Sequence, residues 1–154
     1  MTRIAINWTL ESDFETAVPK GFAADNSEDP DFAYSGTRVL GTDLTVDGRY
    51  RINILDSNAY YATTPTINLQ YYTDVKLNFK KWIAFEGNDQ GVIEVTIDNG
   101  TTWQRIWDSK SDALTPDYEW VNYTLSTEFN SIVAHEPAVK VRFGVIASNA
   151  IYAY

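Results

Sequence analysis

Alternation of apolar and polar side chains with a period of two is the feature that most constrains how this chain folds. Half-buried strands of antiparallel sheets produce this alternation, and no window of the sequence shows a helical period. About nine segments carry a strand signal. The clearest are 4–10, 50–54, 75–79, 93–97, 121–125 and 139–145. Their number and spacing predict an all-β protein, an antiparallel two-sheet β-sandwich with jelly-roll topology.

Turn residues agree with this prediction. Asn99-Gly100 tolerates the positive φ of a hairpin turn, so a hairpin is expected between 93–98 and 102–107. The prolines fall in loops or at strand ends. Because no linker or repeat interrupts the pattern, we expect residues 1–154 to form a single jelly-roll domain. The less regular stretches are 11–36, 56–66, 108–118 and 126–137, and a short helical turn is expected in the last.

Charge and cysteine content exclude several functional classes. The net charge of −9 argues against a nucleic-acid partner and against an anionic membrane surface. The absence of cysteine excludes disulfides, cysteine-ligated zinc and thiol nucleophiles. No apolar run approaches the roughly 20 residues that span a bilayer, so no membrane insertion is expected. The first residues do not resemble a signal peptide, which favours a non-secreted chain or one whose leader was removed.

The sequence gives little indication of a set of catalytic residues. The single histidine, His135, lies in a loop, and no Gly-x-Ser-x-Gly elbow presents a serine to it. Glu94 and Asp98 lie four residues apart on one predicted strand, about 13 Å from each other, which is too far for a retaining glycosidase pair. We therefore expect that the protein is not an enzyme, and a glycoside hydrolase is the least favoured function.

The acidic residues are concentrated in one segment. Residues 11–31 hold seven acidic side chains and one lysine, so they carry −6 of the net −9. Within them, 25–31 is rich in side-chain oxygens, the ligands that calcium prefers. Two interpretations remain open from charge alone: a calcium site, to which Asp13 and Glu15 add ligands, or a solvated acidic loop.

Aromatic side chains offer candidate contacts for a ligand. Tyrosine doublets occupy 60–61 and 71–72, and in an alternating strand one member of each doublet must face outward. Trp103 and Trp107 are expected to share one strand face. Exposed tyrosine and tryptophan stack on sugar rings and anchor protein interfaces, although core packing is the alternative for each of them. The ligand-binding candidates are Tyr61, Tyr72 and Trp107.

Several segments follow one another as in a known family. A Phe-Glu pair at 14–15 precedes a Pro-Lys-Gly-Phe step at 19–22 and the acidic cluster at 25–31. A Thr-Pro-Thr-Ile-Asn-Leu run follows at 64–69, and the hairpin sequence at 90–103 ends in Asn-Gly-Thr-Thr-Trp. In this order they resemble the cleaved-adhesin domains, and the hairpin resembles that of MAM-like, peptidase-associated jelly-roll domains.

The resemblance implies a non-catalytic adhesion or binding module, extracellular or at the cell surface, that recognises carbohydrate or protein through loops and exposed aromatics. It also implies structural Ca²⁺, with the ligand positions Glu15, Asp25, Asp29 and Asp31. The family's acidic closing strand has no counterpart before Tyr154. The last strand is therefore expected to be incomplete, with an open sheet edge that a second copy covers in a homo-oligomer. The alternative is a structural subunit of a virion or an extracellular fibre.

Overall fold

The computed structural model of the protein describes residues 9–11, 14–17, 30, 32–42, 59–83, 89–112, 117 and 119–146. These residues form nine strands and one short helix. The elements are β1 (Thr9–Leu10), β2 (Phe14–Ala17), β3 (Val39–Thr42), β4 (Ala59–Thr63), β5 (Leu77–Lys81), β6 (Gln90–Thr96), β7 (Gln104–Asp108), β8 (Val121–Leu125), α1 (Thr127–Val133) and β9 (Lys140–Ile146).

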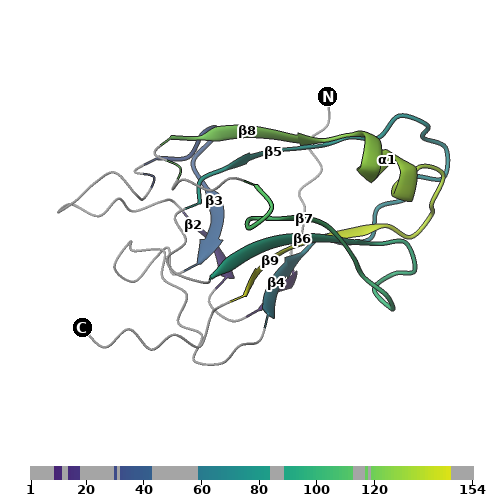
Figure 1. Ribbon diagram of the computed structural model, residues 1–154, viewed down its shortest axis with the longest axis horizontal. Coiled ribbons are helices and arrows are strands. Elements are labelled where there is room, and N and C mark those ends of the chain that lie inside the picture. Colours follow the sequence, from purple (N-terminus) through teal and green to yellow (C-terminus); the bar gives the residue numbers. More distant parts are fainter. Residues whose placement is uncertain are drawn as a thin grey trace.

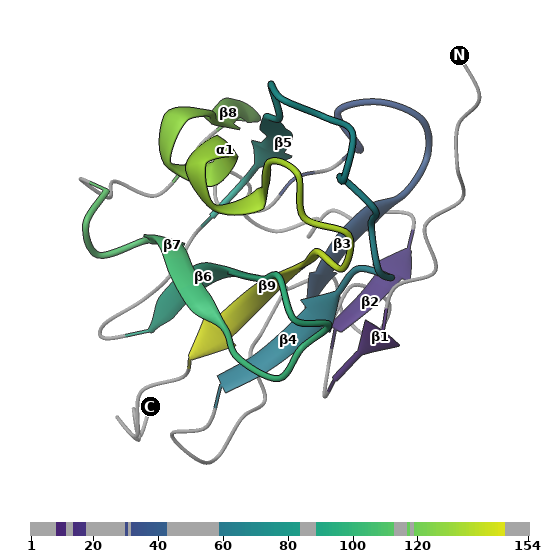
Figure 2. The same cartoon turned by 90° about the vertical axis from the view of Figure 1, so that its right-hand side faces the viewer.

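All strand pairs are antiparallel. The largest sheet has the order β1-β4-β9-β6-β7, and two-stranded ribbons are formed by β2 with β3 and by β5 with β8. The β5–β8 ribbon and α1 form a second layer over one face of the large sheet (Figures 1 and 2). This sandwich-like arrangement confirms the predicted all-β, antiparallel class. The strands predicted at 121–125 and 139–145 correspond to β8 and β9.

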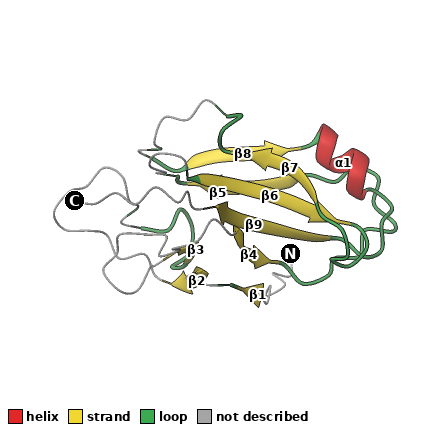
Figure 3. Ribbon diagram, turned by 60° about the horizontal axis from the view of Figure 1, so that its bottom comes forward, coloured by secondary structure: helices red, strands yellow, loops and turns green. Residues whose placement is uncertain are grey.

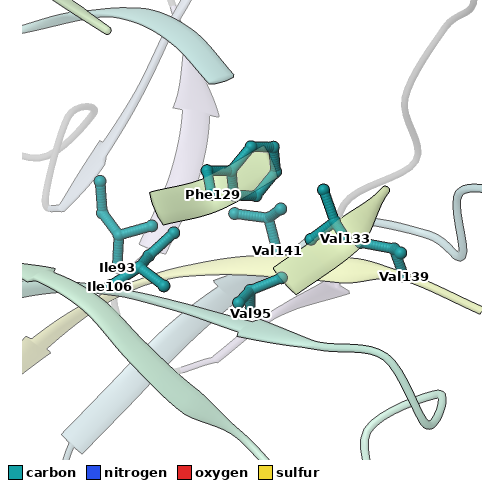
Figure 4. Packing of buried hydrophobic residues seen from close by; sticks show 7 residues of the cluster. All are labelled: Ile93, Val95, Ile106, Phe129, Val133, Val139 and Val141. Carbon is teal, nitrogen blue, oxygen red and sulfur yellow. The ribbon is translucent and has the colours of Figure 1, made fainter. Parts of the chain in front are cut away.

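The hydrophobic core lies between the two layers. Valine and isoleucine side chains of β6 and β9 meet the buried face of α1, which presents Phe129 and Val133 one helical turn apart (Figure 4). The ring of Phe79 on β5 lies edge-on to Phe143 on β9, with 5.6 Å between ring centroids. The helix therefore serves to close one end of the sandwich, as Figure 3 shows, and it confirms the helical turn predicted within 126–137.

Strand β4 lies inside the sheet, although 56–66 was expected to be irregular. It pairs with β1 on one side and β9 on the other. Its buried side chain is Ala62, which is fully inaccessible to solvent. A small residue on the inward face removes the alternation of large apolar side chains on which the prediction depended, so the prediction was wrong for residues 59–63.

The hairpin between β6 and β7 is confirmed, and it contains a bulge. Asn99 and Gly100 both have positive φ, 61° and 103°. Along the strands, Ile93 pairs with Trp107 while Glu94 pairs with Arg105, so Ile106 is an extra residue. A bulge of this kind shifts the alternation of side chains beyond it. As a result Trp103 contacts Arg142 on the outer face of the large sheet while Trp107 packs against Tyr123 of the second layer, and the expectation that they share one face was wrong.

Candidate functional site

Two adjacent tyrosines are among the most exposed large apolar side chains of the described residues. Tyr71 is 84% exposed and Tyr72 is 59% exposed. They lie in a turn after residue Ile67 rather than in a strand, so neither ring is directed into the core. An outward-facing member of this doublet was expected from strand alternation; both tyrosines are exposed, and they lie in a turn and not in a strand. We call residues 67–72 the tyrosine turn.

Main-chain hydrogen bonds fasten the start of the tyrosine turn to the segment that precedes β9. Ile67 and Val139 exchange two hydrogen bonds, with N···O distances of 2.7 and 3.0 Å. The amide of Leu69 donates to the carbonyl of Glu136 at 2.9 Å. The side chain of Asn68 accepts a hydrogen bond from the amide of residue 70 at 3.0 Å.

The end of the tyrosine turn is held in the same way. The amide of Tyr72 donates to the carbonyl of Leu69 at 2.9 Å, which closes the turn. The amide of His135 donates to the carbonyl of Tyr72 at 3.2 Å. His135 adopts a positive φ of 68°, and its Nδ1 lies 3.4 Å from the carbonyl oxygen of Gln70. The backbone under both rings is therefore fixed before any ligand arrives.

Tyr61 lies elsewhere, on the outer face of the large sheet, in what we call the arginine cluster: Tyr61, Glu94, Trp103, Arg105 and Arg142. The guanidinium carbon of Arg142 is 3.7 Å from the centroid of the Tyr61 ring and 4.0 Å from that of Trp103. Burial and the nearby Glu94 carboxylate raise the pKa of Tyr61. One face of the Tyr61 ring is thus covered by Arg142, and a contact between Tyr61 and a ligand stays a prediction.

Glu94 is the centre of the arginine cluster. Its Oε1 accepts hydrogen bonds from Nε and Nη2 of Arg105 at 3.3 and 3.1 Å, and its Oε2 accepts from Nε and Nη2 of Arg142 at 2.8 and 2.6 Å. Burial by itself raises the pKa of Glu94, but hydrogen bonds from the two arginines outweigh it and hold the pKa below its ordinary value. The carboxylate therefore stays ionised and joins β6, β7 and β9.

Trp107 is half-buried at the edge of the core. Its ring packs edge-on to Tyr123 of β8 at 5.8 Å, and its Nε1 donates to Oδ2 of Asp112 at 3.3 Å. The structure thus does not bring Trp107 together with Tyr61 or Tyr72. A contact between Trp107 and a ligand stays a prediction.

The predicted calcium ligands fall largely beyond the described residues. Asp25, Asp29 and Asp31 lie outside them, and of Glu15 only the backbone is described, in β2, where it pairs with Gly41. Among the described residues, no group of three or more acidic or histidine side chains is placed to hold a metal ion. The expected open edge at 147–154 also lies outside, so calcium and self-association stay predictions.

Two polar arrangements in the structure were not predicted from the sequence. Asp98 was placed on a strand, but it lies in the turn between β6 and β7, where its carboxylate accepts hydrogen bonds from Thr96 and Thr102. The arginine cluster was missed because its charged residues are far apart in sequence. A signal was present at Glu94, the only charged residue of β6, whereas Arg142 occupies an ordinary polar position of the alternation in β9.

No protein-family model, curated protein or solved structure matches this chain. In the part of the chain that the structure describes, no helix is long and apolar enough to cross a membrane.

Proposed function

We propose that this protein is a non-catalytic binding module that recognises carbohydrate through Tyr71 and Tyr72. The observation that carries the proposal is that two adjacent tyrosines, 84% and 59% exposed, stand on a turn whose backbone is fixed at both ends. Exposed aromatic pairs are costly to keep in water, and in a fixed turn they offer flat apolar faces at little cost in conformational entropy.

The surroundings of the two rings suit a sugar better than a large apolar protein surface. The exposed polar residues Asn68 and Gln70 belong to the tyrosine turn itself, and the exposed His135 is hydrogen-bonded to its backbone. Sugar rings present apolar C–H faces between hydroxyl groups, so they need aromatic planes with hydrogen-bonding groups beside them. A protein partner is the alternative occupant, and the experiment below separates the two.

The proposal includes the jelly-roll connectivity and a structural calcium ion, with Glu15, Asp25, Asp29 and Asp31 as ligands. The antiparallel, two-layered arrangement of the described strands supports the first. The concentration of negative charge in 11–31 supports the second, because a divalent ion offsets repulsion among crowded carboxylates.

A glycan array tests the proposed function. The wild-type chain is expected to bind a subset of glycans, and the double variant Tyr71→Ala/Tyr72→Ala to lose at least about tenfold in signal, since aromatic anchors dominate such interfaces. Tyr34→Ala, which removes an exposed tyrosine from another segment, is the matched control and is expected to bind as the wild type does. Absence of glycan binding by the wild-type chain would overturn the proposal and leave a protein ligand as the occupant.

A further inference from the structure

The arginine cluster has hydrogen-bonding capacity left over. Both guanidinium groups use Nε and Nη2 to hold Glu94, which leaves Nη1 of each without a partner among the described residues. The side chain of Arg105 is 41% exposed and that of Arg142 is 21% exposed. The cluster is therefore reachable from solvent on the outer face of the large sheet, on the side away from α1.

Charge in the cluster is unbalanced. Two guanidinium groups share one carboxylate, so the three side chains together carry one excess positive charge. Lys140 lies two residues before Arg142 on β9, hence on the same face of the sheet. One further acid reaches a member of the cluster: the carboxylate of Glu11 accepts from the main-chain amide of Tyr61 at 3.1 Å.

Arg142 is also fixed in orientation. The rings of Tyr61 and Trp103 lie 3.7 and 4.0 Å from its guanidinium carbon, and Glu94 holds one of its edges. A guanidinium group that is already ordered by Glu94 loses little conformational entropy when it binds a further anion. Arginine also presents paired N–H donors whose geometry matches the oxygens of an oxyanion.

We propose that Arg105 and Arg142 form a binding site for an oxyanion, the carboxylate or sulfate group of an acidic ligand, on the outer face of the large sheet. Such a group accepts hydrogen bonds from the remaining N–H donors and neutralises the excess charge. The site shares no residue with the tyrosine turn, so the two proposals can fail independently.

The test follows the side-chain Nε–Hε signals of the two arginines by NMR during titration with sodium sulfate, against sodium chloride at equal ionic strength. We expect saturable shifts of both signals with sulfate and none with chloride. In Arg105→Gln, the Arg142 signal is expected to report about fivefold weaker sulfate binding, since one charged pair of an exposed site is lost. Shifts of equal size with chloride would overturn the proposal.

The matched control is Lys76→Gln, which removes one positive charge from an exposed side chain outside the cluster. Sulfate affinity is expected to be unchanged in this variant. A loss equal to that of Arg105→Gln would show that net charge alone governs binding and would overturn the site. Titration with glucuronate and with glucose 6-sulfate, each against neutral glucose, then distinguishes a carboxylate ligand from a sulfated one; no preference for either over glucose would also contradict the proposal.

Discussion

The ring of Tyr61 on β4 occupies the space above Gly144, its direct partner on β9. A Cβ atom at Gly144 would lie 2.5 Å from two ring atoms of Tyr61 and 2.9 Å from Cγ2 of Val92. The glycine is thus required by close approach and not by a turn. Its missing side chain lets the tyrosine ring lie against the sheet, where Arg142 covers it.

We expect Gly144→Ala to lower the free energy of unfolding by about 2 kcal/mol, because the added methyl group overpacks a fixed contact. Urea denaturation measures the change. In a double-mutant cycle, the same substitution is expected to cost less in a Tyr61→Ala background, where the ring no longer resists. Equal costs in both backgrounds would contradict the contact.

The ion pair between Lys81 and Asp117 is nearly buried, with side chains 9% and 10% exposed and Nζ–Oδ distances of 3.2 and 3.0 Å. We expect Asp117→Ala to cost about 3 kcal/mol, because it leaves the ammonium group of Lys81 without its partner away from water. The double variant Lys81→Met/Asp117→Leu is expected to be closer to the wild type than Asp117→Ala is. If Lys81→Met/Asp117→Leu were less stable than Asp117→Ala, this expectation would be contradicted, and the ion pair itself would be strongly stabilising. Urea denaturation of all three chains makes the comparison.

Acid is expected to remove the stabilising effect of Asp98. Hydrogen bonds from Thr102 and then Thr96 hold the pKa of Asp98 well below its usual value. A lowered pKa in the folded state means that the stabilisation is fully present above the unfolded-state pKa, about 3.9, and is lost as pH falls below it. Asp98→Asn is therefore expected to lower the thermal midpoint at neutral pH, by an amount that shrinks below about pH 4. A difference that stays constant down to pH 2 would contradict this assignment.

Much of the fold could be predicted from the sequence, because successive side chains of a strand point to opposite faces of the sheet and half-buried strands therefore alternate apolar and polar residues. Strand β8 alternates strictly, and apolar residues recur at every second position in β6 (Ile93, Val95) and β9 (Val141, Phe143, Val145). The short α1 fell within the segment where a helical turn was expected. What escaped prediction depends on contacts between distant segments. Strand β4 is defined by its pairing with β9 and not by its own composition.

The candidate sites also depend on contacts between distant segments, which the sequence pattern does not predict. An exposed tyrosine in the 71–72 doublet was expected from strand alternation, but the turn that exposes both tyrosines is set by residues 133–139, more than 60 positions later. A single bulge residue, Ile106, decides that Trp107 packs inward. The pairing of Glu94 with Arg142 follows from the register of β6 and β9, which no local pattern encodes.

Calcium is expected to raise the thermal midpoint. Binding to the folded state at ten times the dissociation constant adds about 1.4 kcal/mol of stability. Differential scanning fluorimetry with millimolar calcium and with chelator measures the shift. Asp29→Asn is expected to abolish it, whereas Asp74→Asn, the same change at an exposed acidic residue, leaves it intact. Identical melting curves with calcium and chelator would remove calcium from the proposed function.

The most direct measurement is calorimetric titration of the best glycan from the array into the wild-type chain, Tyr71→Ala/Tyr72→Ala and the control Tyr34→Ala. Because Tyr71 and Tyr72 are exposed, the double variant is expected to unfold within about 0.5 kcal/mol per substitution of the wild type. We expect its affinity to fall at least about tenfold while the control binds normally. Undiminished binding by a folded Tyr71→Ala/Tyr72→Ala variant would contradict the central claim that the tyrosine turn is the binding site.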